Sequence, residues 1–294
     1  MLKKIKPSRV VLYAFIVFTV AFTLTPVLFI VSNSFMSSTE ALNRYTPEIT
    51  PVNMQNLNYG EIHFAEFTLL PTVLTFASYV ELLFTNQLYM RLFWNSIMIV
   101  VPVVIGQILI SAPAAYAFEY AKFKYKEVFY VLYITVLILP MQVLLVPHYI
   151  TANLFGTSNT LLAIILPALF NPFGVFLIRQ QLKGFPYECI EAARIDGAND
   201  WHLFMKIVLP NLAPIVASLS ILTFAEYWNV VDQAVVFLKN PYTEPLSAYL
   251  SRLIQGNDGM VFATSAFYLF PAIIVFMIGQ EYLAKGVSLS GVGK

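Results

Sequence analysis

The sequence predicts an all-α integral membrane protein with six transmembrane helices and both termini in the cytoplasm. Of the 294 residues, 59% are hydrophobic and 11% are charged, whereas soluble domains carry about 25% charged residues. Six apolar stretches recur along the chain, each near or above the ~20 residues that a bilayer demands of a helix. The placement of Lys and Arg between these stretches sets their orientation.

The first apolar stretch, residues 10–35, follows a short basic segment. It is far longer than the ~7–15 apolar residues of a secretory signal, and no clear cleavage site follows it. We therefore expect residues 1–35 to form a cytoplasmic N-terminus and an uncleaved first transmembrane helix.

Residues 36–91 form the longest hydrophilic stretch and contain several prolines and glutamates. They carry no catalytic constellation, so we expect an extracytoplasmic loop that covers one face of the membrane domain. Spaced apolar residues over 76–91 suit a short surface helix within it.

Five further apolar stretches form the expected transmembrane core, residues 92–284. They cover residues 93–120, 128–150, 159–178, 211–237 and 261–284. The first of them carries Ser111 and Ala115, small residues four apart that allow close approach of helix backbones. Residues 238–260 are predicted to be a turn-rich linker, and residues 285–294 a cytoplasmic tail.

Basic residues are distributed unevenly between the two sides of the predicted membrane domain. Of the 17 Lys and Arg, only Arg44, Arg91, Lys239 and Arg252 fall on the side of the 36–91 loop, and the acidic residues show no such bias. The positive-inside rule therefore places both termini and the polar loop, defined here as residues 180–210, in the cytoplasm. The sequence thus predicts a multi-pass membrane protein.

Composition also excludes several functions. A net charge of +1 gives no electrostatic reason to bind nucleic acid. One cysteine and three widely separated histidines form neither a disulfide framework nor a metal site. A membrane enzyme or an ion-coupled carrier needs ionisable groups at membrane depth. The two acids of the fifth helix, Glu226 and Asp232, fall in its outer half at 1.5 Å per residue, so no catalytic residue is predicted.

The polar loop is predicted to form two short helices. Asp196 and Gly197 predict a turn, and Asp196 can cap a second helix that begins near Ala198 and is stopped by Pro210. Two interpretations are equally compatible with this pattern. The helices can dock in a groove of a cytoplasmic partner, or lie as an amphipathic surface on lipid.

The residues of the polar loop resemble the EAA loop of ABC-importer permeases. The matching residues are Glu191-Ala192-Ala193, Asp196-Gly197-Ala198, Ile207, Leu209 and Pro210. Similarity to the carbohydrate branch of this family extends through Phe93-Trp94-Asn95-Ser96, Ala114-Ala115-Tyr116-Ala117, Leu166-Pro167, Phe176-Leu177-Ile178-Arg179-Gln180, Trp228-Asn229 and Lys285-Gly286-Val287-Ser288. Within that maltose-type branch, the chain is most similar to the smaller, six-helix permease subunit.

This resemblance implies a type I ABC importer permease fold in a bacterial cell membrane, and a heterodimer with a second, homologous permease. Two cytoplasmic ATPase subunits would bind ATP and Mg, so this chain would hold no cofactor and would not be an enzyme. An extracytoplasmic solute-binding protein would deliver a sugar, expected to be an oligosaccharide. Glycerol-phosphate-type solutes are an alternative cargo, and a stand-alone ion-coupled carrier is a more distant alternative.

The resemblance also implies roles for individual residues. The ATPase would be contacted by Glu191, Ala192, Ala193, Asp196, Gly197 and Ala198, with Glu191 paired to one of its basic residues. The C-terminal tail would reach the ATPases through Gly286, Ser288 and Gly291. Aromatic, amide and carboxylate side chains suit sugar hydroxyls, so we expect a substrate pathway lined by Glu226, Trp228, Asn229 and Asp232. Packing is the more usual role of the Trp228-Asn229 pair in this family.

Overall fold

The computed structural model describes residues 7–45, 68–256 and 259–291, and within these ranges it contains helices and no strands. The predicted all-α class is therefore confirmed. The beginning of the basic N-terminus, the middle of the 36–91 loop and the last residues of the tail lie outside these ranges. The chain divides into two compact units, residues 1–90 with 250–269 (unit 1) and residues 91–249 with 270–294 (unit 2).

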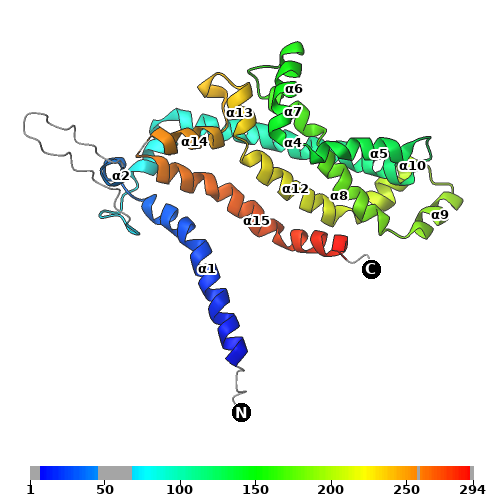
Figure 1. Cartoon of the computed structure of the whole chain (residues 1–294), viewed down its shortest axis with the longest axis horizontal. Coiled ribbons are helices and arrows are strands. Elements are labelled where there is room, and N and C mark those ends of the chain that lie inside the picture. Colours follow the sequence, from blue (N-terminus) through cyan, green and yellow to red (C-terminus); the bar gives the residue numbers. More distant parts are fainter. Residues whose placement is uncertain (1–6, 46–67, 257–258, 292–294) are drawn as a thin grey trace, which may run out of the picture. The chain divides into compact units, whose positions relative to one another are not determined.

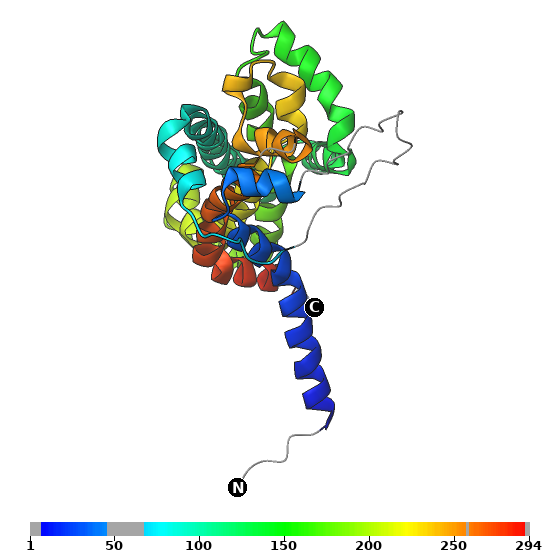
Figure 2. The same cartoon turned by 90° about the vertical axis from the view of Figure 1, so that its left-hand side faces the viewer.

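Unit 1 begins with one long apolar helix. This helix, α1 (Pro7–Asn33), has 27 residues and is unbroken in both views (Figure 1 and Figure 2). At about 1.5 Å per residue it is longer than the ~30 Å hydrocarbon core of a bilayer. Its apolar side chains from Val11 onward are largely exposed, which suits a helix surrounded by lipid. The helix expected over residues 10–35 is thus present.

The rest of unit 1 contains more helix than the sequence predicted. Ser37 caps α2 (Ser38–Tyr45), because its hydroxyl accepts a hydrogen bond from the Glu40 N–H at 3.2 Å. The Glu40 carboxylate pairs with Arg44 one turn later at 3.1 Å. The surface helix expected over 76–91 is present as α3 (Ala77–Val80) and the π-helical segment η1 (Glu81–Thr85).

Unit 2 is built mainly from helices that differ in length and in continuity. They are α4 (Gln87–Tyr120), α5 (Lys126–Thr135), η2 (Val136–Ile138), α6 (Met141–Leu154), α7 (Leu162–Leu169), α8 (Pro172–Lys183), α9 (Tyr187–Ile195), α10 (Asp200–His202), η3 (Leu203–Val208), α11 (Leu209–Asn211), α12 (Ala213–Trp228), α13 (Asp232–Phe237), η4 (Pro241–Thr243), α14 (Leu246–Gly256) and α15 (Val261–Gly291). α4, α14 and α15 extend across the division between the units.

The described chain has four helices that are long and apolar enough to cross a membrane, or up to six if each of two bent pairs counts as one span. One bent pair is residues 126–138 with 141–154, which meet at 106° (Figure 1). The sequence predicted one helix over 128–150 with Pro140 inside it, whereas the structure breaks the helix at Pro140. Leu139 is extended, with ψ 127°, because the residue before a proline is disfavoured in the helical region.

Two other expectations in the second half of the chain were also wrong. The helix expected over 211–237 is broken between α12 and α13. The linker expected over 238–260 contains the helix α14, whose first turn is held by α4. The Leu246 N–H donates to the Ser96 hydroxyl at 2.9 Å, and the Asn95 amide donates to the carbonyls of Tyr242 and Glu244 at 2.9 Å each. These long-range bonds satisfy the backbone there, which local turn signals do not reveal.

Small residues let three helices of unit 2 pack closely. Ser111 of α4 is buried and faces Gly174 of α8, where an added Cβ would meet the Ser111 hydroxyl. The same Cβ would lie 3.2 Å from the Leu219 side chain of α12. Thr223 of α12 also donates a buried hydrogen bond to Gln107 of α4. The predicted close approach at Ser111 is therefore confirmed.

This contact predicts that Gly174→Ala destabilises the protein by about 1–3 kcal/mol, because overpacking a well-packed core displaces its neighbours. Thermal unfolding of the purified protein in detergent measures the loss. Adding Ser111→Gly should recover most of it, because the clash is with the Ser111 side chain. A Gly174→Ala protein as stable as the original would contradict the close approach of α4 and α8.

Candidate functional site

The polar loop folds as two helical segments separated by a tight turn. Helix α9 ends with the hydrogen-bond pattern of a Schellman motif: the Ala198 N–H donates to Ala193 O and the Gly197 N–H to Arg194 O, both at 3.0 Å. Gly197 has φ +87° and nothing lies within 4 Å of a built Cβ. Glycine is therefore favoured there by backbone conformation rather than by space.

The second segment begins at Asp200, two residues later than the sequence predicted. Asn199, not Asp196, is its N-cap, since the Asn199 side chain accepts a hydrogen bond from the His202 N–H at 2.8 Å. Asp196 instead terminates α9. The segment then runs through α10, η3 and α11, and Pro210 lies inside it rather than stopping it. The axis bends by 72° between residues 200–211 and α12.

The inner face of the polar loop is buried. Ile190 of α9 and Leu203, Phe204 and Val208 of the second segment belong to one apolar core. The same core contains residues of α4, α8 and α12, namely Ala112, Ala115, Tyr116, Tyr120, Val175, Ile178, Leu182, Ile215 and Leu219. The two helical segments are therefore packed onto the ends of the long helices rather than hanging from them.

Polar contacts fix the two segments to each other and to α4. Arg194 of α9 pairs with Asp200 of α10 at 3.0 Å, and the Tyr116 hydroxyl donates to the same carboxylate at 3.4 Å. The hydrogen bond to Asp200 raises the pKa of the Arg194 guanidinium above its usual value. At the start of the loop, the Tyr120 hydroxyl donates to Leu182 O at 3.1 Å.

The outer face of the polar loop is exposed and carries both charge and apolar surface. Glu191 and Ala192 are exposed on α9. Ile195 is 86% exposed and Trp201 is 68% exposed. Glu191 has no ion pair among the described residues. Large exposed apolar side chains beside an unpaired carboxylate are typical of a surface that contacts another protein.

A buried guanidinium lies at the base of the loop. The Arg179 side chain of α8 is 5% exposed and pairs with Glu119 of α4 at 3.0 Å and with Glu127 of α5 at 2.8 Å. Its Cζ also lies 3.8 Å from the centre of the Tyr130 ring. One residue thus holds the adjacent ends of three helices together.

The tail residues continue a helix. The backbone positions of Gly286, Ser288 and Gly291 belong to α15, which runs to Gly291. The tail is therefore helical over residues 285–291, and residues 292–294 lie outside the described ranges.

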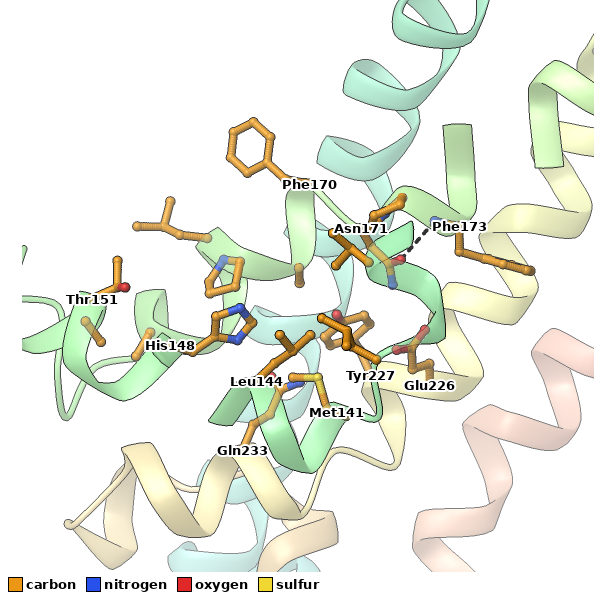
Figure 3. Close-up of a pocket in the computed structure, with 18 of the residues that line it drawn as sticks. Met141, Leu144, His148, Thr151, Phe170, Asn171, Phe173, Glu226, Tyr227 and Gln233 are labelled. Atoms are coloured by element: carbon orange, nitrogen blue, oxygen red, sulfur yellow. Dashed lines mark hydrogen bonds between the residues drawn. The ribbon is translucent and has the colours of Figure 1, made fainter. Parts of the chain in front are cut away.

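A second candidate site is a cavity of about 800 Å³ in unit 2. α5, α6, α7, α8, α12 and α13 contribute to its walls, which are mostly apolar (Figure 3). Polar side chains enter it at His148, Asn171, Glu226, Tyr227 and Gln233. Across the described residues, no group of three His, Cys, Asp or Glu is placed to hold a metal.

Of the four predicted pathway residues, only Glu226 lines this cavity. Trp228 is 1% exposed and packs between Phe93 and Phe224. Asn229 bonds back to Ala225 O at 2.9 Å. Asp232 accepts a hydrogen bond from Gln142 at 3.3 Å. The structure thus separates Glu226 from the other three.

Sequence reasoning did not identify His148, Asn171 and Gln233 as candidate residues. They come from α6, the start of α8 and α13, far apart along the chain. Pro147 precedes His148, and Pro172 follows Asn171. Prolines mark irregular membrane helices, so polar residues beside them could have been identified from the sequence as candidates.

Residues 107–289 match the profile of a family described as the binding-protein-dependent transport system inner membrane component. The chain belongs to this family. It is therefore a multi-pass component of a membrane transport system, and the prediction that it is not an enzyme is confirmed.

Two sugar-transport permeases are similar to this chain over most of its length. The arabinooligosaccharides transport system permease protein AraQ of Halalkalibacterium halodurans is 31% identical over 225 residues, which are 76% of this chain and 81% of that protein. The alpha-glucoside transport system permease protein AglG of Rhizobium meliloti is 33% identical over 233 residues, which are 76% of this chain and 61% of that protein.

Among solved structures, a bacterial ABC transporter involved in the import of the acidic polysaccharide alginate has a TM-score of 0.77 at 21% identity. The similarity covers 95% of this chain and 98% of that one. At this identity it shows the fold alone, and it confirms the predicted importer permease fold.

The Arg179 cluster gives a prediction about stability. Arg179→Met should destabilise the protein by about 1–3 kcal/mol, because Glu119 and Glu127 lose their charge-assisted hydrogen bonds to the buried guanidinium. Arg179→Lys should recover part of this loss, since an ammonium keeps the charge but not the forked geometry. The midpoint of thermal unfolding measures both variants. If the Met variant unfolds at the original temperature, Arg179 does not hold the three helices.

Proposed function

We propose that this chain is the permease subunit of a binding-protein-dependent ABC importer for a sugar, expected to be an oligosaccharide. It works with a second, homologous permease, two cytoplasmic ATPases and an extracytoplasmic solute-binding protein. The two bent pairs each count as one span in this proposal, which gives six spans with both termini in the cytoplasm. ATP and Mg are bound by the ATPases and not by this chain.

The cargo class in this proposal rests on the relatives. Their names specify arabinooligosaccharides, lactose and alpha-glucosides. A carbohydrate is the cargo common to these relatives. They are 28% to 33% identical to this chain over 66% to 76% of its length.

The polar loop is the proposed ATPase-docking site, and its exposed outer face is the observation that carries this proposal. Glu191 is available for a basic residue of the ATPase, and Ile195 and Trp201 supply apolar contact area. Ala192, Ala193 and Ala198 are small enough for the helices to enter a groove. The positive φ of Gly197 turns the chain between them.

The alternative, an amphipathic surface on lipid, is less compatible with the charges of this face. Glu188, Glu191 and Asp196 are exposed beside Ile195. Interfacial helices usually place Lys and Arg on the polar face, because the cytoplasmic leaflet is anionic. An acidic rim around an exposed isoleucine suits a basic protein groove better.

The proposed mechanism follows from the core beneath the loop. When the two ATPases close on ATP, they displace the docked α9 and the second segment. Ile190 and Phe204 transmit that displacement to α4, α8 and α12, because all belong to one close-packed core. The helices then move together and change the side of the membrane to which the pathway opens. The helical tail, with Gly286, Ser288 and Gly291, is proposed as a second contact with the ATPases.

The docking role predicts the effect of reversing one charge. Glu191→Lys should leave the protein in the membrane but lower ATP hydrolysis stimulated by the binding protein by about tenfold or more, because an interfacial charge pair becomes a repulsion. Glu191→Asp should keep most of the stimulation. Full stimulation in the Lys variant would remove Glu191 from the docking site.

The turn at Gly197 predicts that a bulky residue there weakens binding of the ATPase. Gly197→Val should lower the amount of ATPase that co-purifies with the permease, because a β-branched residue at positive φ costs about 1–3 kcal/mol. Gly197→Asn is the matched control and should retain the ATPase, since asparagine tolerates the left-handed region. Equal recovery of ATPase with the Val and Asn variants would contradict the role of this turn.

A further inference from the structure

The cavity in unit 2 contains a carboxylate that the described chain does not neutralise. Glu226 is exposed toward this space, and no ion pair or hydrogen bond joins it to another described residue (Figure 3). Among the described residues that line the cavity, none is Lys or Arg and Glu226 is the one acid. An unpaired ionisable group within a membrane domain is a functional candidate.

The other polar groups of the cavity are the amides of Asn171 and Gln233, the imidazole of His148 and several tyrosine and threonine hydroxyls. Tyr227, Asn171 and Gln233 all line this space (Figure 3). The Nδ1 atom of His148 is buried and has no hydrogen-bond partner among the described residues. These groups converge on a largely apolar space (Figure 3), and a few placed polar groups in an apolar cavity are typical of a small-molecule site.

The composition of this lining favours one kind of solute. Sugar hydroxyls can donate to the Glu226 carboxylate, and tyrosine and phenylalanine walls suit the apolar faces of sugar rings. A phosphate or uronate would meet Glu226 without a lysine or arginine to balance the repulsion. The solved relative imports an acidic polysaccharide, so the shared fold does not determine this preference.

We propose that this cavity contacts the solute during transport and that Glu226 makes it selective for uncharged carbohydrate over anionic sugars and glycerol-phosphate-type solutes. This inference rests on the proposed function, because it assigns the substrate class of the same importer. Glu226 thus remains a pathway residue. His148, Asn171, Tyr227 and Gln233 take the place of Trp228, Asn229 and Asp232.

The charge of the cavity is testable with thiol reagents. Cys189 is the one cysteine of the chain, so Cys189→Ser with Leu144→Cys puts a single thiol on the cavity wall. The experiment uses the assembled transporter without ATP, at about pH 8, where an ordinary imidazole is neutral. It compares the rates at which two methanethiosulfonate reagents modify this thiol, one with a cationic trimethylammonium group and one with an anionic sulfonate group. Each rate is divided by that of a free thiol in solution.

The cationic reagent should react about tenfold faster than the anionic one, because the local potential is negative. Glu226→Gln should abolish that difference, and Glu226→Asp should retain it. A thiol that does not react, or an unchanged ratio in the Gln variant, would overturn the role of Glu226.

Occupancy is tested by protection of the same thiol from an uncharged reagent. Arabinotriose should slow the reaction, and trigalacturonate or glycerol 3-phosphate should slow it only in the Glu226→Gln variant. Equal protection by neutral and anionic solutes in the original chain, or protection by neither, would overturn the proposed selectivity. None of these rates requires ATP hydrolysis, so they succeed or fail independently of the Glu191 result.

Discussion

Ile190 is fully buried although it lies on an exposed polar helix, and this anchor determines how the polar loop can move. Together with Phe204 it places the loop in the same core as α4, α8 and α12. A close-packed core resists compression and transmits displacement. A force applied to the outer face at Glu191 or Trp201 therefore reaches the long helices without passing through a flexible linker.

Electrostatic contacts reinforce this core at two levels. Asp200 joins Arg194 of the loop to Tyr116 of α4. Arg179 of α8 pairs with Glu119 of α4 and Glu127 of α5. Both pairs involve residues from different helices, so each resists sliding of one helix past another. The exposed outer face and the packed inner face together support the proposed coupling role of this loop.

The sequence was most informative where function depends on local chemistry. The Asp-Gly pair predicted the turn at Gly197, because few residues tolerate positive φ. It could not distinguish Asp196 from Asn199 as the second cap, since both side chains can accept the required bond. The bend at Pro140 and the cavity needed the tertiary structure, because hydropathy alone does not reveal which helix is broken or which polar groups meet.

Docking of the polar loop on the ATPase is the central claim, and Cys189 offers the most direct test of it. This cysteine is exposed on α9, so a hydrophilic maleimide should label it readily in the isolated permease. Adding the ATPase subunits should slow labelling by about tenfold or more, because access controls thiol reactivity. A Val235→Cys thiol on α13, in a Cys189→Ser chain, should label at the same rate with and without ATPase. Equal labelling of Cys189 in both states would contradict docking at this loop.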